Sequence, residues 1–212
     1  MVQKAKAAGI PVVALNSGFT QWQKLGALMY FGQDEELAGQ AGGQRLSQEG
    51  AKHVICIAPE QGNVSIDARC RGAKNDFSGK LETLYVNGSD LPSVETTVAA
   101  KLKQDPSIDY LLAQGAPVTL TSVKSVAGAN SPAKIVAFDL NPQVVEPIKS
   151  GQVQWTIDQQ PYVQGFLAID SLWLYLANGN TVGGGKEVLT GPAFVTKDNI
   201  DQLAKYAEGG TR

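Results

Sequence analysis

Polar side chains follow most of the predicted strands of this 212-residue chain, at the point where each strand ends. They are amides, carboxylates, a hydroxyl and a guanidinium, which bind partners through planar, often bidentate hydrogen bonds. Sugars match such groups, because each sugar hydroxyl both donates and accepts a hydrogen bond. Taken singly, residues of these types are more often turn and cap residues. The set comprises Asn16-Ser17, Glu60–Asn63, Gln114-Gly115, Asp139 and Asp158–Gln160, together with Gln33-Asp34 at a helix start and Arg69 in the helix after Asn63.

The elements that must position these side chains alternate between strand and helix. Strands are predicted at Pro11–Leu15, His53–Ala58, Thr83–Val86, Tyr110–Ala113, Lys134–Phe138 and Val153–Asp158. With helical patterns between them, they predict an α/β fold of parallel sheets flanked by helices. Ligands of open parallel sheets bind beyond the carboxyl ends of the strands, where the polar set lies.

Helix boundaries can be read from capping residues. Asp34 is expected to cap a helix ending at Glu49, and Ser93 one from Val94 to Gln104. Further helices are predicted for the segments that start at Pro142, Pro161 and about Lys197, which are expected to end near 151, 178 and 207. The first nine residues read as the last turns of a helix capped by Gly9, so we expect the chain to begin inside a larger fold.

The composition narrows the class of protein. With 43% hydrophobic and 18% charged residues and a net charge of −2, the chain is expected to fold as an ordinary globule and not to bind nucleic acid. The longest largely apolar stretch, Val163–Ala177, contains Gln164 and Asp170 and is too short to span a bilayer. The N-terminus lacks the pattern of a secretory signal.

The chain offers few groups for metal binding or nucleophilic catalysis. Its one histidine, His53, is expected at the surface, and its two cysteines cannot assemble a structural zinc site. No Gly-x-Ser-x-Gly elbow accompanies His53, so a Ser-His-Asp triad is not predicted. Cys56 and Cys70 either form a disulfide or are two small core residues, and the sequence leaves both readings open. No cofactor is indicated.

The ordered set of segments resembles the type I periplasmic sugar-binding proteins of ABC importers, of the ribose-binding class. The resemblance covers essentially the whole chain, and it lies in the order and spacing of the segments and not in any one motif. The matching segments are Ile10–Ser17, Gly32–Asp34, Asp67–Gly72, Ile135–Asp139, Ile157–Pro161 and Leu189–Asn199.

The resemblance implies two α/β lobes that close over a sugar, joined by three crossing strands. Residues 1–33 would be a remnant of the N-terminal lobe, 34–159 a complete C-terminal lobe, and 160–212 the return to the first lobe and the C-terminal tail. It also implies roles in binding. Asn16 and Ser17 would contact sugar from the first lobe, and Gln33 would lie at the first crossing. Arg69 and Asp139 would bind sugar hydroxyls, and Gln159 would sit on the third contact strand. Phe138 would supply an apolar wall, and Gly115 stands at a position where the family commonly has Asn. With Asn63 from the strand-end set, these residues form the expected ligand-binding site.

The same resemblance implies that roughly ninety residues of the first lobe lie outside this chain, a length comparable to a small domain. We therefore expect the chain alone to bind sugar weakly, and an incomplete first lobe to favour self-association. The expected function is the non-enzymatic, periplasmic sugar-binding component of an ABC importer, with an inner-membrane permease as partner. The alternative is the effector-binding domain of a LacI-type transcription regulator, and a small α/β enzyme is a third reading.

Overall fold

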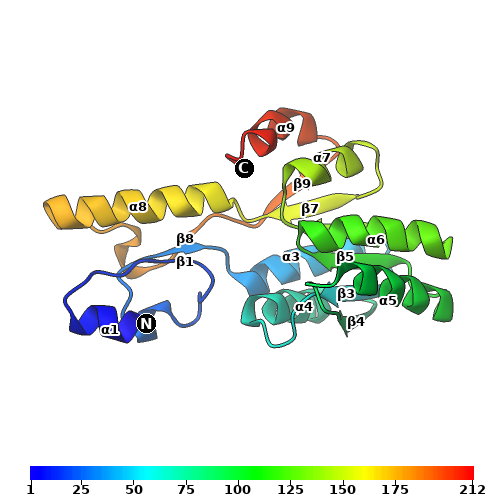
Figure 1. Cartoon of the computed structure of the whole chain (residues 1–212), viewed down its shortest axis with the longest axis horizontal. Coiled ribbons are helices and arrows are strands. Elements are labelled where there is room, and N and C mark those ends of the chain that lie inside the picture. The colour runs from blue at the N-terminus through cyan, green and yellow to red at the C-terminus, as the bar shows by residue number, and fades with distance from the viewer.

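The chain forms two separate sheets in a computed structural model that describes all residues, Met1–Arg212 (Figure 1). The first sheet has three short parallel strands in the order β1 (Ala14–Asn16), β2 (Tyr30–Gly32) and β8 (Val188–Leu189). The second has six strands in the order β4-β3-β5-β6-β7-β9. Their bounds are His53–Ala58 (β3), Lys80–Tyr85 (β4), Tyr110–Gln114 (β5), Lys134–Phe138 (β6), Trp155–Asp158 (β7) and Ala193–Thr196 (β9).

The second sheet is covered by helices on both faces, because alternate residues of its strands point to opposite sides. Ile55 and Ile57 of β3 belong to a 22-residue core with the helices of one face, and Val54 and Cys56 to a 16-residue core with those of the other. The first face carries α5 (Leu91–Gln104), α6 (Ala116–Ala129), α7 (Pro142–Lys149) and α9 (Ile200–Glu208), and the second carries α3 (Glu35–Gln48) and α4 (Val64–Asp76). All neighbouring strands pair in parallel except β9, which runs antiparallel to β7.

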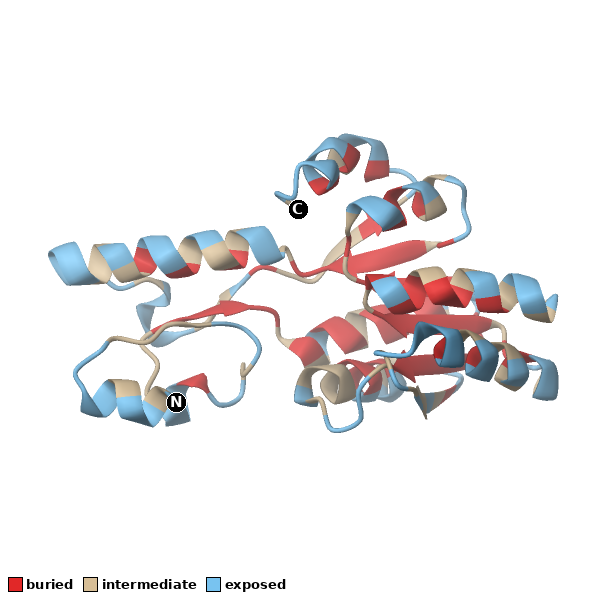
Figure 2. Cartoon of the chain, viewed as in Figure 1, coloured by how far each residue is buried: buried red, intermediate tan, exposed pale blue.

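The first sheet has a much smaller core. Its buried apolar cluster contains only Met29, Phe31 and Ala168, supported by partly buried neighbours. Its remaining elements are α1 (Val2–Ala7), α2 (Trp22–Leu25), α8 (Pro161–Asn178), which packs on β1 and β2, and a short 3₁₀ turn at Gly183–Gly185. Figure 2 shows exposed residues along α8. An exposed apolar stripe on this helix comprises Tyr162, Phe166, Ile169, Trp173 and Leu176, at spacings of three and four residues.

The chain crosses between the two sheets at three places. It leaves β2 for α3, leaves β7 for α8, and leaves β8 for β9. Figure 1 shows the three connections side by side between the two sheets. The last segment therefore divides, since β8 joins the first sheet while β9 and α9 join the second.

The predicted strands are confirmed, two of them with the same bounds as the sequence predicts: β3 and β6. Strand β2 was not predicted, because Tyr30–Gly32 is too short to show a period. The cap predicted at Ser93 is wrong. The helix begins at Leu91, and Asp90 caps it by accepting a hydrogen bond from the Ser93 N–H. A proline is well tolerated in the first turn, so Pro92 does not delay the helix.

The sequence predicted that His53 lies at the surface, and this prediction is wrong. It is only 4% exposed, and its Nδ1 lies 2.8 Å from the Ser107 hydroxyl. The first residue of a strand is covered here because β3 is an interior strand, flanked by β4 and β5. The two cysteines, whose state the sequence left open, form a disulfide that joins β3 to α4.

Helices α3 and α4 approach each other at backbone distance. Gly39 and Gly43 of α3 face the backbone of Arg69 and Ala73, and Gly72 of α4 faces the carbonyl of Glu36. A side-chain carbon at any of these glycines would overlap the facing carbonyl oxygen. We call Gly39, Gly43 and Gly72 the glycine seam. It sets the distance between the two helices over their second and third turns.

We expect Gly72→Ala to lower the free energy of unfolding by about 1–3 kcal/mol, because the added methyl must push the two helices apart. Urea denaturation of the whole chain measures this effect. Gly128→Ala in α6 is the matched control, since nothing lies within 4 Å of its added carbon and alanine favours a helix. Equal stability of the two variants would contradict close contact at the seam.

Candidate ligand-binding site

Thr190 ties the three crossings together. Its hydroxyl lies 2.6 Å from the Gln159 carbonyl and 3.2 Å from that of Gly32, and its N–H donates to the same Gly32 carbonyl at 2.8 Å. The Gln164 amide, fully buried at the start of α8, donates to the Gln159 carbonyl and the Thr190 hydroxyl. The ends of β2, β7 and β8 are therefore held at one point.

Tyr30 links this point to the first sheet. Its fully buried hydroxyl lies 2.9 Å from the Asn16 carbonyl and 3.2 Å from the Gln33 carbonyl. Burial and the nearby charges of Glu35 and Asp34 raise the pKa of this hydroxyl, so it remains protonated and acts as a donor.

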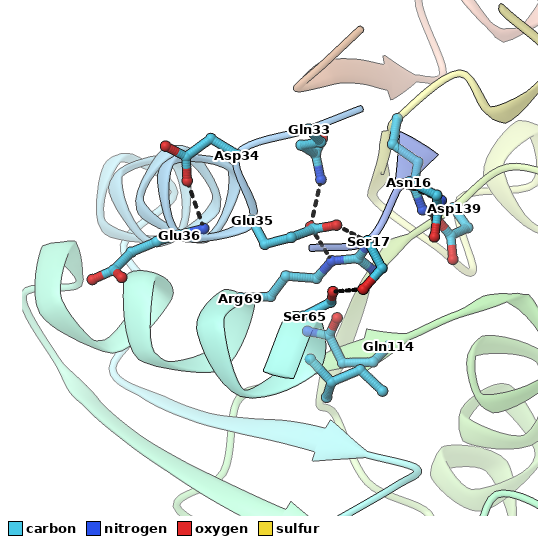
Figure 3. Close-up of polar contacts among 12 residues, drawn as sticks. Asn16, Ser17, Gln33, Asp34, Glu35, Glu36, Ser65, Arg69, Gln114 and Asp139 are labelled. Atoms are coloured by element: carbon cyan, nitrogen blue, oxygen red, sulfur yellow. Dashed lines mark hydrogen bonds and ion pairs between the residues drawn. The ribbon is translucent and has the colours of Figure 1, made fainter. Parts of the chain in front are cut away.

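Arg69 in the second turn of α4 and Glu35 at the start of α3 form a bidentate ion pair (Figure 3). The Arg69 Nε and Nη2 donate to the two carboxylate oxygens at 2.5 and 3.0 Å, and both side chains are only 7% exposed. The Gln33 amide donates to the same carboxylate at 2.9 Å, and the guanidinium lies over the buried Phe138 ring. Burial lowers the pKa of Arg69, but its bonds to Glu35 and the charges of Glu35 and Asp139 outweigh burial and raise it. Arg69 is therefore a permanent cation.

Asp139 follows β6 and belongs to a chain of amides. Gln159 donates to its Oδ1 at 2.8 Å, and Asn16 donates to Gln159 at 3.0 Å and to Gln164 at 3.2 Å. Asp139 adopts a positive φ of 71°, a conformation that Asp and Asn tolerate better than most residues. Figure 3 shows Asp139 beside Asn16, so groups from both sheets meet here.

Two charged groups in this region keep an unused hydrogen-bonding atom. Arg69 Nη1 and Asp139 Oδ2 have no hydrogen-bond partner within the protein. Neither of these two atoms is fully enclosed by the protein. They are thus open to a ligand. Ser17 and Ser65 approach each other from the two sides at 3.2 Å, and Ser65 and Glu35 also line a hollow of about 620 Å³ between the loop after β1 and the starts of α3 and α4.

The residues expected from the sequence fall into two groups. Asn16, Gln33, Arg69, Asp139 and Gln159 lie in one hydrogen-bonded region. A side-chain carbon added at Gly115 would lie 3.9 Å from Asp139 Oδ2, so this glycine borders the same region. Asn63 instead caps α4, accepting from the N–H groups of Ser65 and Ile66, and Phe138 is a fully buried core ring beneath Arg69. Tyr30, Glu35, Gln164 and Thr190 were missed. Only Glu35, an acidic residue directly after a predicted cap, had a visible signal, and it suggested a helix start rather than a partner for Arg69.

The sequence profile described as Periplasmic binding protein domain matches residues 1–181. The chain belongs to this family. A solved carbohydrate transporter of Acidothermus cellulolyticus, in complex with myo-inositol, is 57% identical with a TM-score of 0.97, over the whole of this chain and 74% of that one. The xylose/arabinose-binding protein of Sulfolobus acidocaldarius is 29% identical over 99% of this chain and 56% of its own length. The chain thus spans little more than half of that curated relative.

More distant structures share the fold alone. A periplasmic ribose ABC transporter of Conexibacter woesei is 19% identical with a TM-score of 0.83, over 96% of this chain and 70% of that one. The α/β class predicted from the sequence, with parallel sheets flanked by helices in the manner of type I periplasmic binding proteins, is confirmed. No helix has the length and apolar content needed to cross a membrane, and no three His, Cys, Asp or Glu side chains cluster as metal ligands would.

Asp158 makes the stability of this family member depend on pH. It is fully buried at the end of β7, where burial raises its pKa despite the Gln160 N–H and the Arg212 guanidinium, which lies 2.7 Å away. The folded chain therefore binds this proton more tightly than the unfolded chain, whose Asp has a pKa of about 3.9. The protonated Asp158 therefore contributes its full stabilisation below the unfolded-state pKa of about 3.9. This stabilisation is lost as the pH rises through the raised pKa of Asp158 in the folded chain.

We expect Asp158→Asn to flatten the fall of the unfolding free energy as the pH rises above about 4, by at most about 1.4 kcal/mol per pH unit. Urea denaturation at several pH values measures the slope. The control is Asp198→Asn, an exposed residue whose replacement makes the same change in charge. Parallel slopes for Asp158→Asn and the unaltered chain would contradict the raised pKa.

Proposed function

We propose that this chain is the ligand-binding part of a non-enzymatic solute receptor, which captures a sugar or related polyol for an ABC importer. The observation that carries the proposal is the pair of open, oppositely charged groups, Arg69 Nη1 and Asp139 Oδ2, at the junction between the two sheets. One is a charged donor and the other a charged acceptor, so together they match two hydroxyls on neighbouring carbons. Asn16 and Ser17 lie opposite, on the first sheet.

Family membership and the 57% identical carbohydrate transporter support this function over a LacI-type effector domain. They likewise favour a binding protein over a small α/β enzyme. A permease of the inner membrane is the partner that this role requires, and the periplasm is the compartment that the family description suggests. The disulfide between Cys56 and Cys70 is consistent with an oxidising compartment.

Binding would proceed by closure of two lobes. Residues 1–33 and the first part of 160–212 would form the first lobe around β1, β2, α8 and β8, and residues 34–159 the second. The three crossings, tied at Thr190, would act as the hinge. A ligand hydroxyl loses water favourably only if groups from both lobes replace it, so closure and binding are coupled.

Saturation-transfer NMR of the chain with myo-inositol, D-xylose, D-ribose and D-glucose tests the function, since this method detects affinities weaker than millimolar. We expect at least one of these polyols to bind without being converted. Turnover of a glycoside or sugar phosphate by the pure chain would contradict a receptor function.

Asp139→Asn should weaken binding of that ligand about tenfold, because a neutral amide oxygen is a weaker acceptor than a carboxylate. The variant keeps the acceptor for Gln159 and tolerates the positive φ, so the fold is preserved. Calorimetry or the NMR titration measures the change, with Asp198→Asn as the control. Unchanged affinity would remove Asp139 from the site.

Self-association through the first sheet stays a prediction, and the apolar stripe on α8 is the surface that would carry it. Sedimentation should show a concentration-dependent increase in mass for the chain. Replacing both Phe166 and Trp173 with Glu should abolish the increase, while Ala100→Glu, exposed on α5 of the second sheet, should not. A monomer at all concentrations would contradict this prediction.

A further inference from the structure

We infer that the site selects neutral polyols and rejects sugars that carry a carboxylate, because Glu35 already neutralises Arg69, the only cation among the site residues of this chain. This inference rests on the proposed function and names the ligand class of the same site. An arginine that faces a ligand ordinarily invites an anion, since its guanidinium matches a carboxylate in a bidentate manner. Here the bidentate face of the Arg69 guanidinium already binds the Glu35 carboxylate of the protein itself.

The two nitrogens that form one bidentate face of the Arg69 guanidinium are both occupied by Glu35. A ligand can reach Nη1, but only as a single hydrogen-bond donor whose charge is balanced by a carboxylate on the same guanidinium. Both partners are 93% enclosed, so solvent screens the pair poorly and the compensation is local. Nη1 therefore suits one hydroxyl better than a carboxylate.

The second open group is itself an anion. Asp139 forms no ion pair, although its charge acts on Arg69 from nearby, and its Oδ1 accepts only the neutral amide of Gln159. A ligand carboxylate beside Asp139 Oδ2 would place two negative charges together, whereas a hydroxyl there donates a charge-assisted hydrogen bond. The Asp139 carboxylate thus disfavours ligands that carry a carboxylate and favours ligands that offer a hydroxyl.

The remaining charges around the site do not reverse this balance. Asp158 is paired with Arg212, and Arg71 with Glu36. The adjoining hollow is lined by the acidic residues Asp34, Glu35, Glu36 and Asp67 against the single cation Arg71. An approaching anion meets a net negative surface on this side.

The position of Glu35 is fixed by packing, so the compensation is built into the fold. The glycine seam holds α3 against α4 one turn beyond Glu35, and the disulfide anchors α4 at the residue that follows Arg69. The Phe138 ring supports the guanidinium from below. Glu35 is therefore a positioning residue that also sets specificity, through the charge of Arg69.

Matched ligand pairs test the inference on the unaltered chain. D-glucose and D-glucuronate, and D-galactose and D-galacturonate, differ only in the group at C6, and all four are titrated by saturation-transfer NMR. We expect the neutral member of a pair to bind at least tenfold more tightly at pH 7. Equal or tighter binding of the uronate would overturn the inference and leave the proposed function standing. Failure of every neutral polyol to bind would overturn the proposed function, and the inference with it.

Glu35→Gln then tests the cause. It keeps the shape and a hydrogen-bond acceptor but removes the compensating charge, so the preference for the neutral member should shrink at least tenfold. Glu36→Gln is the matched control, with the same change in charge on the adjacent residue, whose partner Arg71 is exposed, and it should keep the preference. An unchanged preference in a folded Glu35→Gln variant would overturn the role of Glu35. If that variant does not fold, the Glu35→Gln/Arg69→Gln double variant, which removes both charges, replaces it. The double variant should still prefer the neutral member of each pair. A gain of uronate binding by the double variant would contradict the inference.

Discussion

The structure of the junction depends on the buried ion pair between Glu35 and Arg69. Removing two charges from water is unfavourable by several kcal/mol per ion unless they pair closely and their remaining hydrogen bonds are satisfied. The glycine seam makes this close pairing possible, because it lets α3 and α4 pack at backbone distance. The Glu35 and Arg69 side chains meet one helical turn before Gly39, the first glycine of the seam. The pair in turn supports Gln33 at the first crossing and covers Phe138 at the end of β6. Loss of either charge would leave the other enclosed without a partner.

The two sheets contribute unequally to stability. The second sheet has apolar cores of 22 and 16 residues on its two faces, while the first has a cluster of three. Hydrophobic burial is roughly proportional to the apolar area removed from water, so the second sheet carries most of it. The first sheet is held chiefly at the junction, through Tyr30, Thr190 and the amides of Asn16 and Gln164. Polar groups that could bind a ligand therefore also hold the two sheets together.

This double use explains how binding and lobe movement can be coupled. Asn16 reaches from the first sheet to Gln159, and Gln159 reaches Asp139 on the second. A ligand hydroxyl that bonds Asp139 adds a contact to a chain of amides that already spans both sides. Closure then requires no new element, only a change at crossings whose backbone groups are already paired.

The sequence by itself determined most of the strands, though not the short β2, together with the α/β class and the strand ends that carry Asn16, Asp139 and Gln159. Apolar periodicity and capping residues are local signals, and the carboxyl ends of parallel strands meet at one edge whatever the details of packing. Only the tertiary structure decided that Glu35 pairs with Arg69, that Asn63 is a cap, that His53 is buried and that Cys56 is bonded to Cys70. These outcomes depend on the distance between helices and on which strand is interior, and neither is encoded in any short window of residues.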